Sequence, residues 1–386
     1  MAVRRAAGLL RVAVVGLAGA IAGCGSDGVD LDPAQVEEGR QIFRHDTFGD
    51  EQLWTDQLRM HEVIASAVSP QTALAVGLKV DSSVLPPNIL ATADLTAPAT
   101  TVELLRLDAV VGVKGRVENG RLVSIGVTCA LCHSTVDNSV APGIGLRLDG
   151  WANRDLDPGL ILSLSPAMQD PAKQQVLKSW GPGRYDAYWN HDGINNPQVI
   201  PPAYGLRDVE LETFTGEGQV SYWNNYVAVT QMGGRGDFID PRLGIRVDQE
   251  PDMVTPKLPA LQQYQLSLAA PPPPPASFDS AAAARGAALF TGRARCSTCH
   301  SGASFTDVDR TLHMPSEVGT DARLAQRSTT GRYRTTPLRG AWQHPPYFHD
   351  GSARTLGDVV RHYDRHLQLG LGSAEIADLE QYLKSL

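Results

Sequence analysis

Four of the five cysteines of this chain lie in two copies of one frame, Cys129-Ala-Leu-Cys132-His133 and Cys296-Ser-Thr-Cys299-His300. Two thiols spaced in this way can both add to the vinyl groups of a haem, and the histidine that follows can then bind the iron. One copy alone is also compatible with half of a zinc site. Two copies, with no other thiol after residue 24, predict two covalently bound haem c groups, so the fold must be built around two large apolar cofactors.

The fifth cysteine, Cys24, ends a segment with the composition of an export signal. Arginines precede an apolar run over 12–22 that is too short for a permanent transmembrane helix. The sequence Ile21-Ala22-Gly23-Cys24 resembles a bacterial lipobox, in which the cysteine is acylated. We therefore expect a periplasmic protein held at a membrane by a lipid on Cys24. Gly25 and Ser26 do not resemble an inner-membrane retention signal, which favours the outer membrane, and the alternative is an ordinary signal peptide with an incidental cysteine.

The net charge of the chain limits the classes of partner that it can bind. A formal net charge of −8 over 386 residues argues against nucleic acid as a partner. An acidic protein suits a small basic electron donor, although a solvated acidic surface has the same composition. No segment after the export signal is apolar for long enough to cross a membrane.

The clearest domain boundary is a proline-rich stretch over 270–277, which predicts a stiff linker. After it, 281–290 is alanine-rich and helical, and 374–386 carries apolar side chains at helical spacing. A helix before the frame and a closing helix after it resemble a cytochrome c domain. The predicted division is a signal peptide at 1–23, a tether at 24–35, an N-terminal haem domain at 36–269, the linker at 270–277 and a C-terminal cytochrome c domain at 278–386.

The N-terminal domain resembles a stretched version of the same unit. Residues 36–43 parallel residues 284–290, but the N-terminal frame begins only at Cys129, so about 44–127 is predicted to be an insertion. Alternating apolar and polar residues over 102–127, around Glu118-Asn119-Gly120, predict a β-hairpin in it. The expected fold class is mainly α, with two cytochrome c-like haem domains, long loops and this small hairpin.

Three segments of the C-terminal domain carry a family resemblance. They are Thr336-Pro-Leu-Arg-Gly340, Pro346-Tyr-Phe-His-Asp-Gly-Ser352 and Thr355-Leu-Gly-Asp-Val-Val-Arg-His-Tyr363. In order and spacing they resemble the C-terminal domain of the dihaem cytochrome c peroxidase and MauG superfamily. The resemblance covers nearly all of 284–386 and is weaker over the N-terminal part. It implies a dihaem oxidoreductase of bacterial origin.

The resemblance implies that Tyr363 is the sixth ligand of the second haem. True bacterial peroxidases carry methionine at this position, whereas the enzymes that mature methylamine dehydrogenase carry tyrosine. A phenolate favours oxidised iron and a thioether favours ferrous iron. The alternative is that Tyr363 packs on the porphyrin edge while His362 or Met314 binds the iron. His349 is expected either to support the haem surroundings or to be an ordinary buried histidine.

The other face of the first haem has no obvious ligand. No histidine occurs over 134–150, where peroxidases carry a removable one, so we expect an open iron. By resemblance, Trp223 relays electrons between the two haems, or is simply a core indole, and Gln231 is the distal glutamine. No glutamate lies where the catalytic one is expected. The possible substitutes are His191, Glu217 and Asp237.

The leading functional hypothesis is a peroxidase-like oxidoreductase that reduces hydrogen peroxide at the first haem and shares the oxidising equivalents with the second. A small cytochrome or a protein substrate would supply the electrons. One alternative is a non-catalytic dihaem electron carrier, which the missing glutamate favours. The other is an oxygenase that activates dioxygen, as the dihaem rubber-cleaving oxygenases of the same broad group do.

Overall fold

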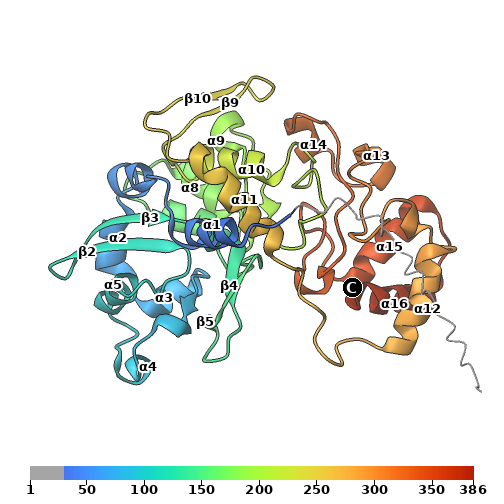
Figure 1. Cartoon of the computed structure of the whole chain (residues 1–386), viewed down its shortest axis with the longest axis horizontal. Helices are drawn as coiled ribbons and strands as arrows, with labels where there is room; N and C mark the ends of the chain where they lie inside the picture. The colour runs from blue at the N-terminus through green and yellow to red at the C-terminus, as the bar shows by residue number, and fades with distance from the viewer. Residues whose placement is uncertain (1–29) are drawn as a thin grey trace, which may run out of the picture.

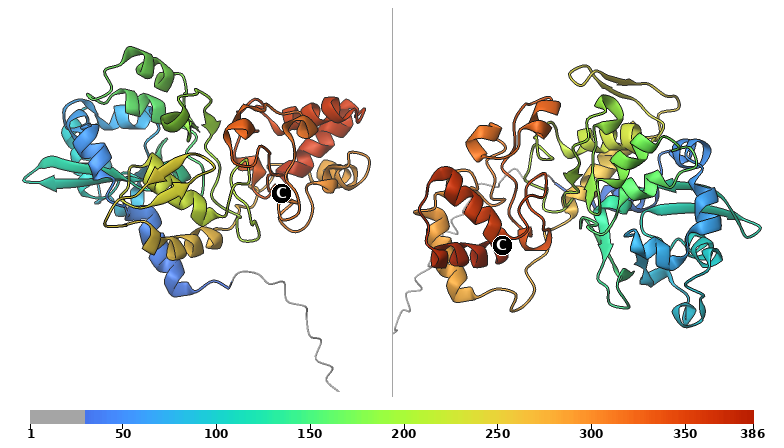
Figure 2. Two further views of the ribbon diagram at one scale, coloured as in Figure 1. Left: turned by 90° about the horizontal axis from the view of Figure 1, so that it is seen from above. Right: turned by 180° about the vertical axis from the view of Figure 1, so that it is seen from behind.

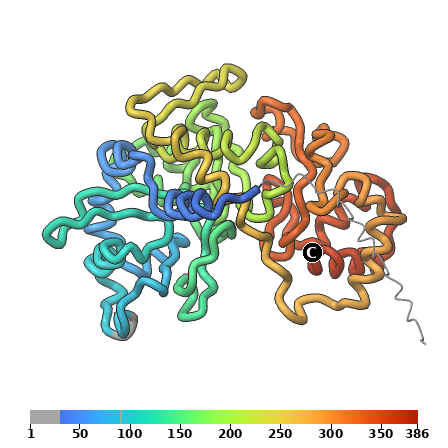
Figure 3. Tube along the Cα trace, viewed as in Figure 1, coloured from blue at the N-terminus to red at the C-terminus, as the bar shows by residue number. Residues whose placement is uncertain are grey.

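The computed structural model describes residues 30–386, which form two lobes of unequal size joined side by side (Figures 1 and 2). The predicted signal peptide and Cys24 lie outside the described residues. Among the described residues, no helix is both long and apolar enough to cross a bilayer. The lobes correspond to the residues before and after the proline-rich stretch, which has no helix or strand over 270–277 and runs as a loop between them (Figure 3).

The larger, N-terminal lobe combines short helices with small two-stranded sheets. Its helices are α1 (Pro33–His45), α2 (Met60–Ala67), α3 (Pro70–Ala75), α4 (Ile89–Thr92), α5 (Pro98–Arg106), α6 (Ala130–His133), α7 (Pro158–Ser163), α8 (Pro171–Lys178), α9 (Trp189–Asp192), α10 (Val220–Tyr226) and α11 (Leu258–Ser267). Its strands are β1 (Val80–Asp81), β2 (Val113–Glu118), β3 (Arg121–Val127), β4 (Ser134–Val136), β5 (Ile144–Gly145), β6 (Arg147–Asp149), β7 (Arg184–Tyr185), β8 (Gln198–Val199), β9 (Phe238–Asp240) and β10 (Ile245–Val247). The strands pair as β1–β5, β2–β3, β4–β6, β7–β8 and β9–β10, and β1–β5 alone is parallel among these pairs of the described chain.

The C-terminal lobe is helical and has a core of its own. Its helices are α12 (Ser280–Thr291), α13 (Pro315–Val318), α14 (Arg323–Arg327), α15 (Leu356–Leu367) and α16 (Ser373–Lys384). The core joins α12, α15 and α16 through Phe290, Leu356, Val360, Leu379 and Leu383. The predicted helices at 281–290 and 374–386 are therefore confirmed, and the mainly α character holds for the described chain.

The predicted hairpin is confirmed in its strands and wrong in its length. β2 and β3 pair around Asn119 and Gly120, both of which have positive φ as a tight hairpin turn requires. Residues 102–106, however, belong to α5, because Pro98 opens a helix whose buried Val102, Leu104 and Leu105 follow helical rather than alternating spacing. The insertion thus holds α2–α5 and the hairpin, on the side of the N-terminal lobe away from the C-terminal lobe (Figure 1).

Both lobes contain the same close helix crossing. In the N-terminal lobe Gly39 of α1 lies so close to α11 that a Cβ atom would be 1.9 Å from the Ala260 carbonyl oxygen. In the C-terminal lobe, a Cβ atom on Gly286 of α12 would be 2.1 Å from the backbone carbonyl oxygen of Asp378 in α16. Four residues after each glycine a phenylalanine meets a tyrosine edge-on, as Phe43–Tyr264 and Phe290–Tyr382. The duplication seen between 36–43 and 284–290 therefore extends to how the helices pack.

Substituting Gly286 with alanine is expected to destabilise the protein by about 1–3 kcal/mol, because α12 must move away from the α16 backbone to admit the methyl group. Gly39→Ala should have a similar effect at the N-terminal crossing. Chemical denaturation of the holoprotein measures both. The control is Ala284→Ser, which adds one atom on the exposed face of α12. Equal stabilities for Gly286→Ala and this control would contradict the packing argument.

The two lobes share a buried interface. Leu324, Ala325 and Tyr333 of the C-terminal lobe are buried in the main core of the N-terminal lobe. Two ion pairs with side chains no more than 8% exposed cross the same interface, Arg327–Asp186 and Arg334–Glu212. Residues 323–334 therefore follow the linker in the chain, but their buried side chains pack in the core of the N-terminal lobe.

Candidate functional site

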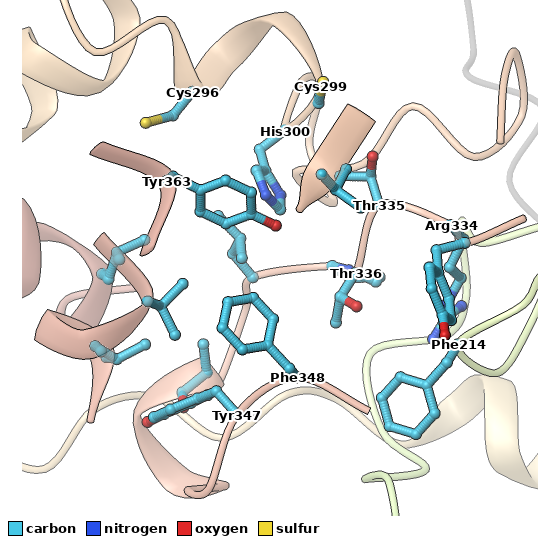
Figure 4. Close-up of a pocket in the computed structure, with 18 of the residues that line it drawn as sticks. Phe214, Cys296, Cys299, His300, Arg334, Thr335, Thr336, Tyr347, Phe348 and Tyr363 are labelled. Carbon is cyan, nitrogen blue, oxygen red and sulfur yellow. The ribbon is translucent and has the colours of Figure 1, made fainter. Parts of the chain in front are cut away.

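Each cysteine–histidine frame opens onto its own cavity. The C-terminal cavity, of about 540 Å³, is lined by Cys296, Cys299, His300 and Tyr363 (Figure 4). Cys296 begins a 3₁₀ turn shortly after α12 ends, so the helix crossing at Gly286 fixes the start of the frame. Burial raises the pKa of the Cys296 thiol to about 11.

His300 is held in a single orientation. Its Nδ1 lies 3.0 Å from the Phe305 carbonyl oxygen, so Nδ1 carries the proton and donates it to that oxygen. This leaves Nε2 as the nitrogen with a free lone pair, which is the arrangement a metal-binding histidine needs. Burial lowers the pKa of His300, which keeps the ring neutral.

Tyr363 lies on α15 and projects into the C-terminal cavity beside His300 (Figure 4). Burial raises the pKa of its hydroxyl to about 12, and no described residue forms a hydrogen bond with this hydroxyl. The other two residues considered as ligands are placed differently. His362 Nε2 donates to the Val318 carbonyl oxygen at 2.9 Å, and Met314 is 41% exposed and does not line the cavity. The arrangement favours Tyr363 as the ligand, which stays a prediction.

The N-terminal cavity, of about 270 Å³, is lined by Cys129, Cys132, His133 and Trp223. The frame forms the short helix α6 directly after β3, so the hairpin positions it. His133 Nδ1 lies 3.1 Å from the Pro201 carbonyl oxygen and donates to it, which again frees Nε2. Burial lowers the pKa of His133 to about 4 and raises that of both thiols to about 12. Both His133 and His300 therefore donate from Nδ1 to a backbone carbonyl oxygen, have a lowered pKa and keep Nε2 free.

Gln231 lines the N-terminal cavity at the end of a π-helical turn that continues α10. Its Oε1 accepts a hydrogen bond from the Tyr185 hydroxyl at 3.0 Å, and its Nε2 donates to Asn190 and Thr230. Within the described chain no histidine except His133 lines this cavity, and the open iron stays a prediction. Met232 also lines it and carries a potential thioether ligand. The sequence argument did not single out Met232.

Glu212, which the sequence pattern does not identify as a site residue, supplies a carboxyl group to the N-terminal cavity. This side chain is 5% exposed, lines the N-terminal cavity and has an Oε1 atom without a hydrogen-bond partner. Burial raises its pKa, although the Arg334 guanidinium at 2.9 Å acts in the opposite direction. Of the substitutes considered from sequence, Glu217 lies one hydrogen bond away from the cavity, since the Tyr188 hydroxyl donates to it at 2.6 Å. His191 and Asp237 do not line the cavity.

A common wall separates the two cavities. The residues that line both of them are Val199, Ile200, Pro201, Pro202, Leu206, Thr213, Phe214 and Arg334. Trp223 lines the N-terminal cavity alone, so the aromatic side chain in the wall is Phe214. The Pro201 carbonyl that accepts from His133 belongs to the same wall. The buried His349, 4% exposed, supports the wall through its carbonyl oxygen, which accepts from Val199 N at 2.8 Å.

Part of the chain is similar in sequence to two methylamine utilization proteins named MauG. The protein from Methylorubrum extorquens is 39% identical over 84 residues, which are 20% of this chain and 24% of the relative. The protein from Methylophilus methylotrophus is 31% identical over 119 residues, which are 26% of this chain and 36% of the relative. These partial similarities are in keeping with the MauG and dihaem cytochrome c peroxidase superfamily that the C-terminal motifs resemble. Because the matches span only 24% and 36% of the MauG proteins, they support the superfamily and not an activity.

Solved structures with partial similarity include a hydrazine synthase and a MauG-like protein. Hydrazine synthase from Kuenenia stuttgartiensis, under xenon pressure, shares 21% identity and a TM-score of 0.34, with 51% of this chain and 74% of that chain covered. A MauG-like protein associated with microbial copper homeostasis shares 19% identity and a TM-score of 0.36, with 50% and 74% covered. No family model matches the chain.

The polar atoms around both cavities fit the haem expected in this superfamily. Arg154 lines the C-terminal cavity with a buried, unpartnered Nε atom and has no carboxylate partner among residues 30–386. Burial lowers its pKa to about 10, the effect of a cation without a counter-ion. The Nε atoms of Arg334 and Trp223 are likewise buried and unpartnered beside the N-terminal cavity. Haem propionates would supply the acceptors that these donors lack.

Proposed function

We propose that the protein is an exported dihaem c-type oxidoreductase in which hydrogen peroxide reacts at the N-terminal haem. The observation that carries the proposal is the pair of cavities, each with two thiols and a histidine whose Nε2 is free. Among the described residues, the N-terminal cavity has no histidine besides His133 and is also lined by the buried carboxyl of Glu212. Cys129, Cys132 and His133 would hold one haem, and Cys296, Cys299, His300 and Tyr363 the other. Bound haem would supply the two-electron reduction of peroxide.

The side chains of the N-terminal cavity have roles that follow from their chemistry. Cleaving the O–O bond requires a group that takes a proton from one oxygen and returns it to the other. Glu212 is the buried carboxyl in the cavity wall with a free oxygen, and burial raises its pKa while Arg334 acts in the opposite direction. The Gln231 amide, fixed by three hydrogen bonds, would orient the peroxide. The wall through Phe214 separates this chemistry from the second cavity.

Electron paramagnetic resonance of the ferric holoprotein tests the proposal. We expect one high-spin signal from the open N-terminal haem and one low-spin signal from the His300–Tyr363 haem. Hydrogen peroxide should then change the absorption bands of the high-spin species. Two low-spin signals, with no response to peroxide, would refute it.

A second function, electron transfer without catalysis, is favoured by one observation. The Met232 side chain lines the N-terminal cavity, so its sulfur would make that haem six-coordinate if it bound the iron. The same spectra separate the two functions, since a methionine ligand gives a low-spin haem. Met232→Leu should leave the spectrum unchanged if the iron is open and should create a high-spin signal if it is not.

Glu212→Gln is expected to slow the reaction with peroxide by a factor of about 10² to 10³, because the amide keeps the shape of the carboxyl group but cannot accept the proton. Stopped-flow absorbance measures the rate of the haem spectral change. The control is Glu103→Gln on the exposed face of α5, which should react like the wild type. A wild-type rate for Glu212→Gln would remove Glu212 from the chemistry and leave it as the buried partner of Arg334.

A further inference from the structure

An aromatic cluster leads from the N-terminal cavity towards the surface. Trp223 lines the cavity, and three tyrosine rings meet it edge-on or nearly so. The ring centroids of Tyr226, Tyr222 and Tyr188 lie 5.3, 5.8 and 6.5 Å from that of Trp223. These rings are close enough for an electron to pass between neighbours. The structure therefore offers three routes by which charge can leave Trp223.

The three tyrosines differ in what receives the phenolic proton. A tyrosine that loses an electron becomes a strong acid, so a stable radical needs a base at the hydroxyl. The Tyr226 hydroxyl donates to the Ala187 carbonyl oxygen at 2.5 Å, and an amide oxygen is no base. Tyr188 donates to the Glu217 carboxylate at 2.6 Å, but Tyr188 is 5% and Glu217 is 7% exposed. Tyr222 donates to Asp240 Oδ2 at 2.8 Å, and its ring is partly exposed.

The Asp240 carboxylate is kept ionised and fixed. The Arg242 guanidinium donates to it at 2.6 and 3.0 Å and lowers its pKa to about 2. Asp240 lies on β9, 3% exposed, while the Arg242 side chain is 57% exposed and reaches over the Tyr222 ring at 6.0 Å. Asp240 and Arg242 lie at the turn between β9 and β10 and hold the Tyr222 hydroxyl, while the Tyr222 ring remains partly exposed. Among the three tyrosines, Tyr222 combines a carboxylate partner with access from outside.

We propose that Tyr222 is a redox-active residue through which a one-electron donor at the protein surface, of the hydroquinone or phenol class, reduces the peroxide-oxidised protein. The proposal rests on the proposed function, since hydrogen peroxide is the oxidant. Trp223, after losing one electron towards the cavity, takes one electron from Tyr222 while the phenolic proton moves to Asp240 Oδ2. The neutral tyrosyl radical then takes one electron from the donor, and the proton returns from Asp240. Each donor molecule loses one electron and one proton and becomes a phenoxyl or semiquinone radical, so two donors and one hydrogen peroxide give two such radicals and two water molecules.

Freeze-quenched electron paramagnetic resonance of the ferric holoprotein, mixed with peroxide without donor, tests this assignment. The wild type should give a tyrosyl radical signal, and Tyr222→Phe should lose it. Tyr226→Phe is the matched control, because it removes a hydroxyl from a ring that also contacts Trp223, and it should keep the signal. Asp240→Asn keeps the Tyr222 ring but removes the base, so its signal should also be lost; this variant carries the test if Tyr222→Phe does not fold. Adding hydroquinone should quench the wild-type radical.

The outcomes separate the inference from the function on which it rests. If peroxide changes the haem absorption equally in all variants but the radical persists in Tyr222→Phe and disappears in Tyr188→Phe, the charge rests on the buried tyrosine and Tyr222 is not the exit. A signal that disappears only in Trp189→Phe would place the exit along the Tyr185–Trp180–Trp189 contacts instead. If peroxide changes no haem band in the wild type, the proposed function and this inference both fail.

Discussion

Tyr363→Met is expected to raise the reduction potential of the C-terminal haem by a large part of the roughly 0.8 V that axial ligands span. A phenolate is a hard anionic ligand that stabilises ferric iron, and a thioether stabilises ferrous iron. Tyr363 projects into the cavity beside His300, and no described residue forms a hydrogen bond with its hydroxyl. A methionine at this position can reach the same space. Spectroelectrochemical titration of the two haems measures the shift, and the N-terminal haem should keep its potential.

The matched control is Tyr382→Phe. Tyr382 belongs to the same lobe and packs against Phe290, but it does not line the cavity, so its loss should leave both potentials unchanged. An unchanged potential in Tyr363→Met would mean that Tyr363 only packs on the porphyrin edge. His362→Ala would then be tested next, although its Nε2 is already used by the Val318 carbonyl oxygen.

The shift would also change what the protein does. With tyrosine, the second haem would hold oxidising equivalents rather than store reducing ones, so electrons would have to enter elsewhere. The Trp223–Tyr222 pair on the opposite lobe gives such an entry. With methionine, the C-terminal haem would accept electrons from an ordinary small cytochrome. The identity of residue 363 and the presence of an exposed redox-active tyrosine are therefore linked features.

The sequence predicted the parts of the site that depend on local spacing. The two frames and the helices α12 and α16 each follow from residues within a few turns of one another. The equivalence of Gly39 and Gly286 was visible in the parallel between 36–43 and 284–290, because a close crossing leaves room only for glycine. These features have a signal in the sequence because neighbouring residues create them.

The remaining parts depend on contacts between distant segments. Glu212 is held in the cavity wall by a hydrogen bond from Arg334, which lies 122 positions later in the chain, so no local pattern marks it. Likewise Phe214 rather than Trp223 forms the aromatic part of the wall, since 213–214 and 199–202 are brought against the C-terminal lobe by tertiary packing. Residues 102–106 are helical although the sequence predicts a strand there, because α5 precedes the hairpin without a clear break in the apolar pattern. No local pattern encodes such arrangements.

Arg327→Ala is expected to lower the free energy of unfolding by about 3–5 kcal/mol, because it leaves a buried carboxylate without its cation. The Arg327 side chain is 5% exposed and reaches from the C-terminal lobe to Asp186, 0% exposed, and to Asp192, 30% exposed. Its guanidinium also donates to the Ile194 carbonyl oxygen. Asp186 in turn accepts hydrogen bonds from the backbone N–H groups of Tyr188 and Asn196, so the damage should spread to the N-terminal cavity that Tyr188 lines. Denaturant titration, followed by haem absorbance and circular dichroism, measures both effects.

The stabilisation that Arg327 provides through Asp192 depends on pH. Burial by itself would raise the pKa of Asp192, but the Arg327 hydrogen bond outweighs it and the pKa lies below its ordinary value of 3.8. A lowered pKa in the folded state stabilises the protein above the unfolded value and ceases to do so as the pH falls through the folded one. The difference between wild type and Arg327→Ala should therefore be full at neutral pH and shrink below pH 3.8. Arg59→Ala, which breaks an exposed pair with Glu62, should leave the free energy of unfolding almost unchanged at any pH. A loss as small as this for Arg327→Ala would mean that apolar packing of Leu324 and Tyr333, rather than the buried ion pairs, joins the two lobes.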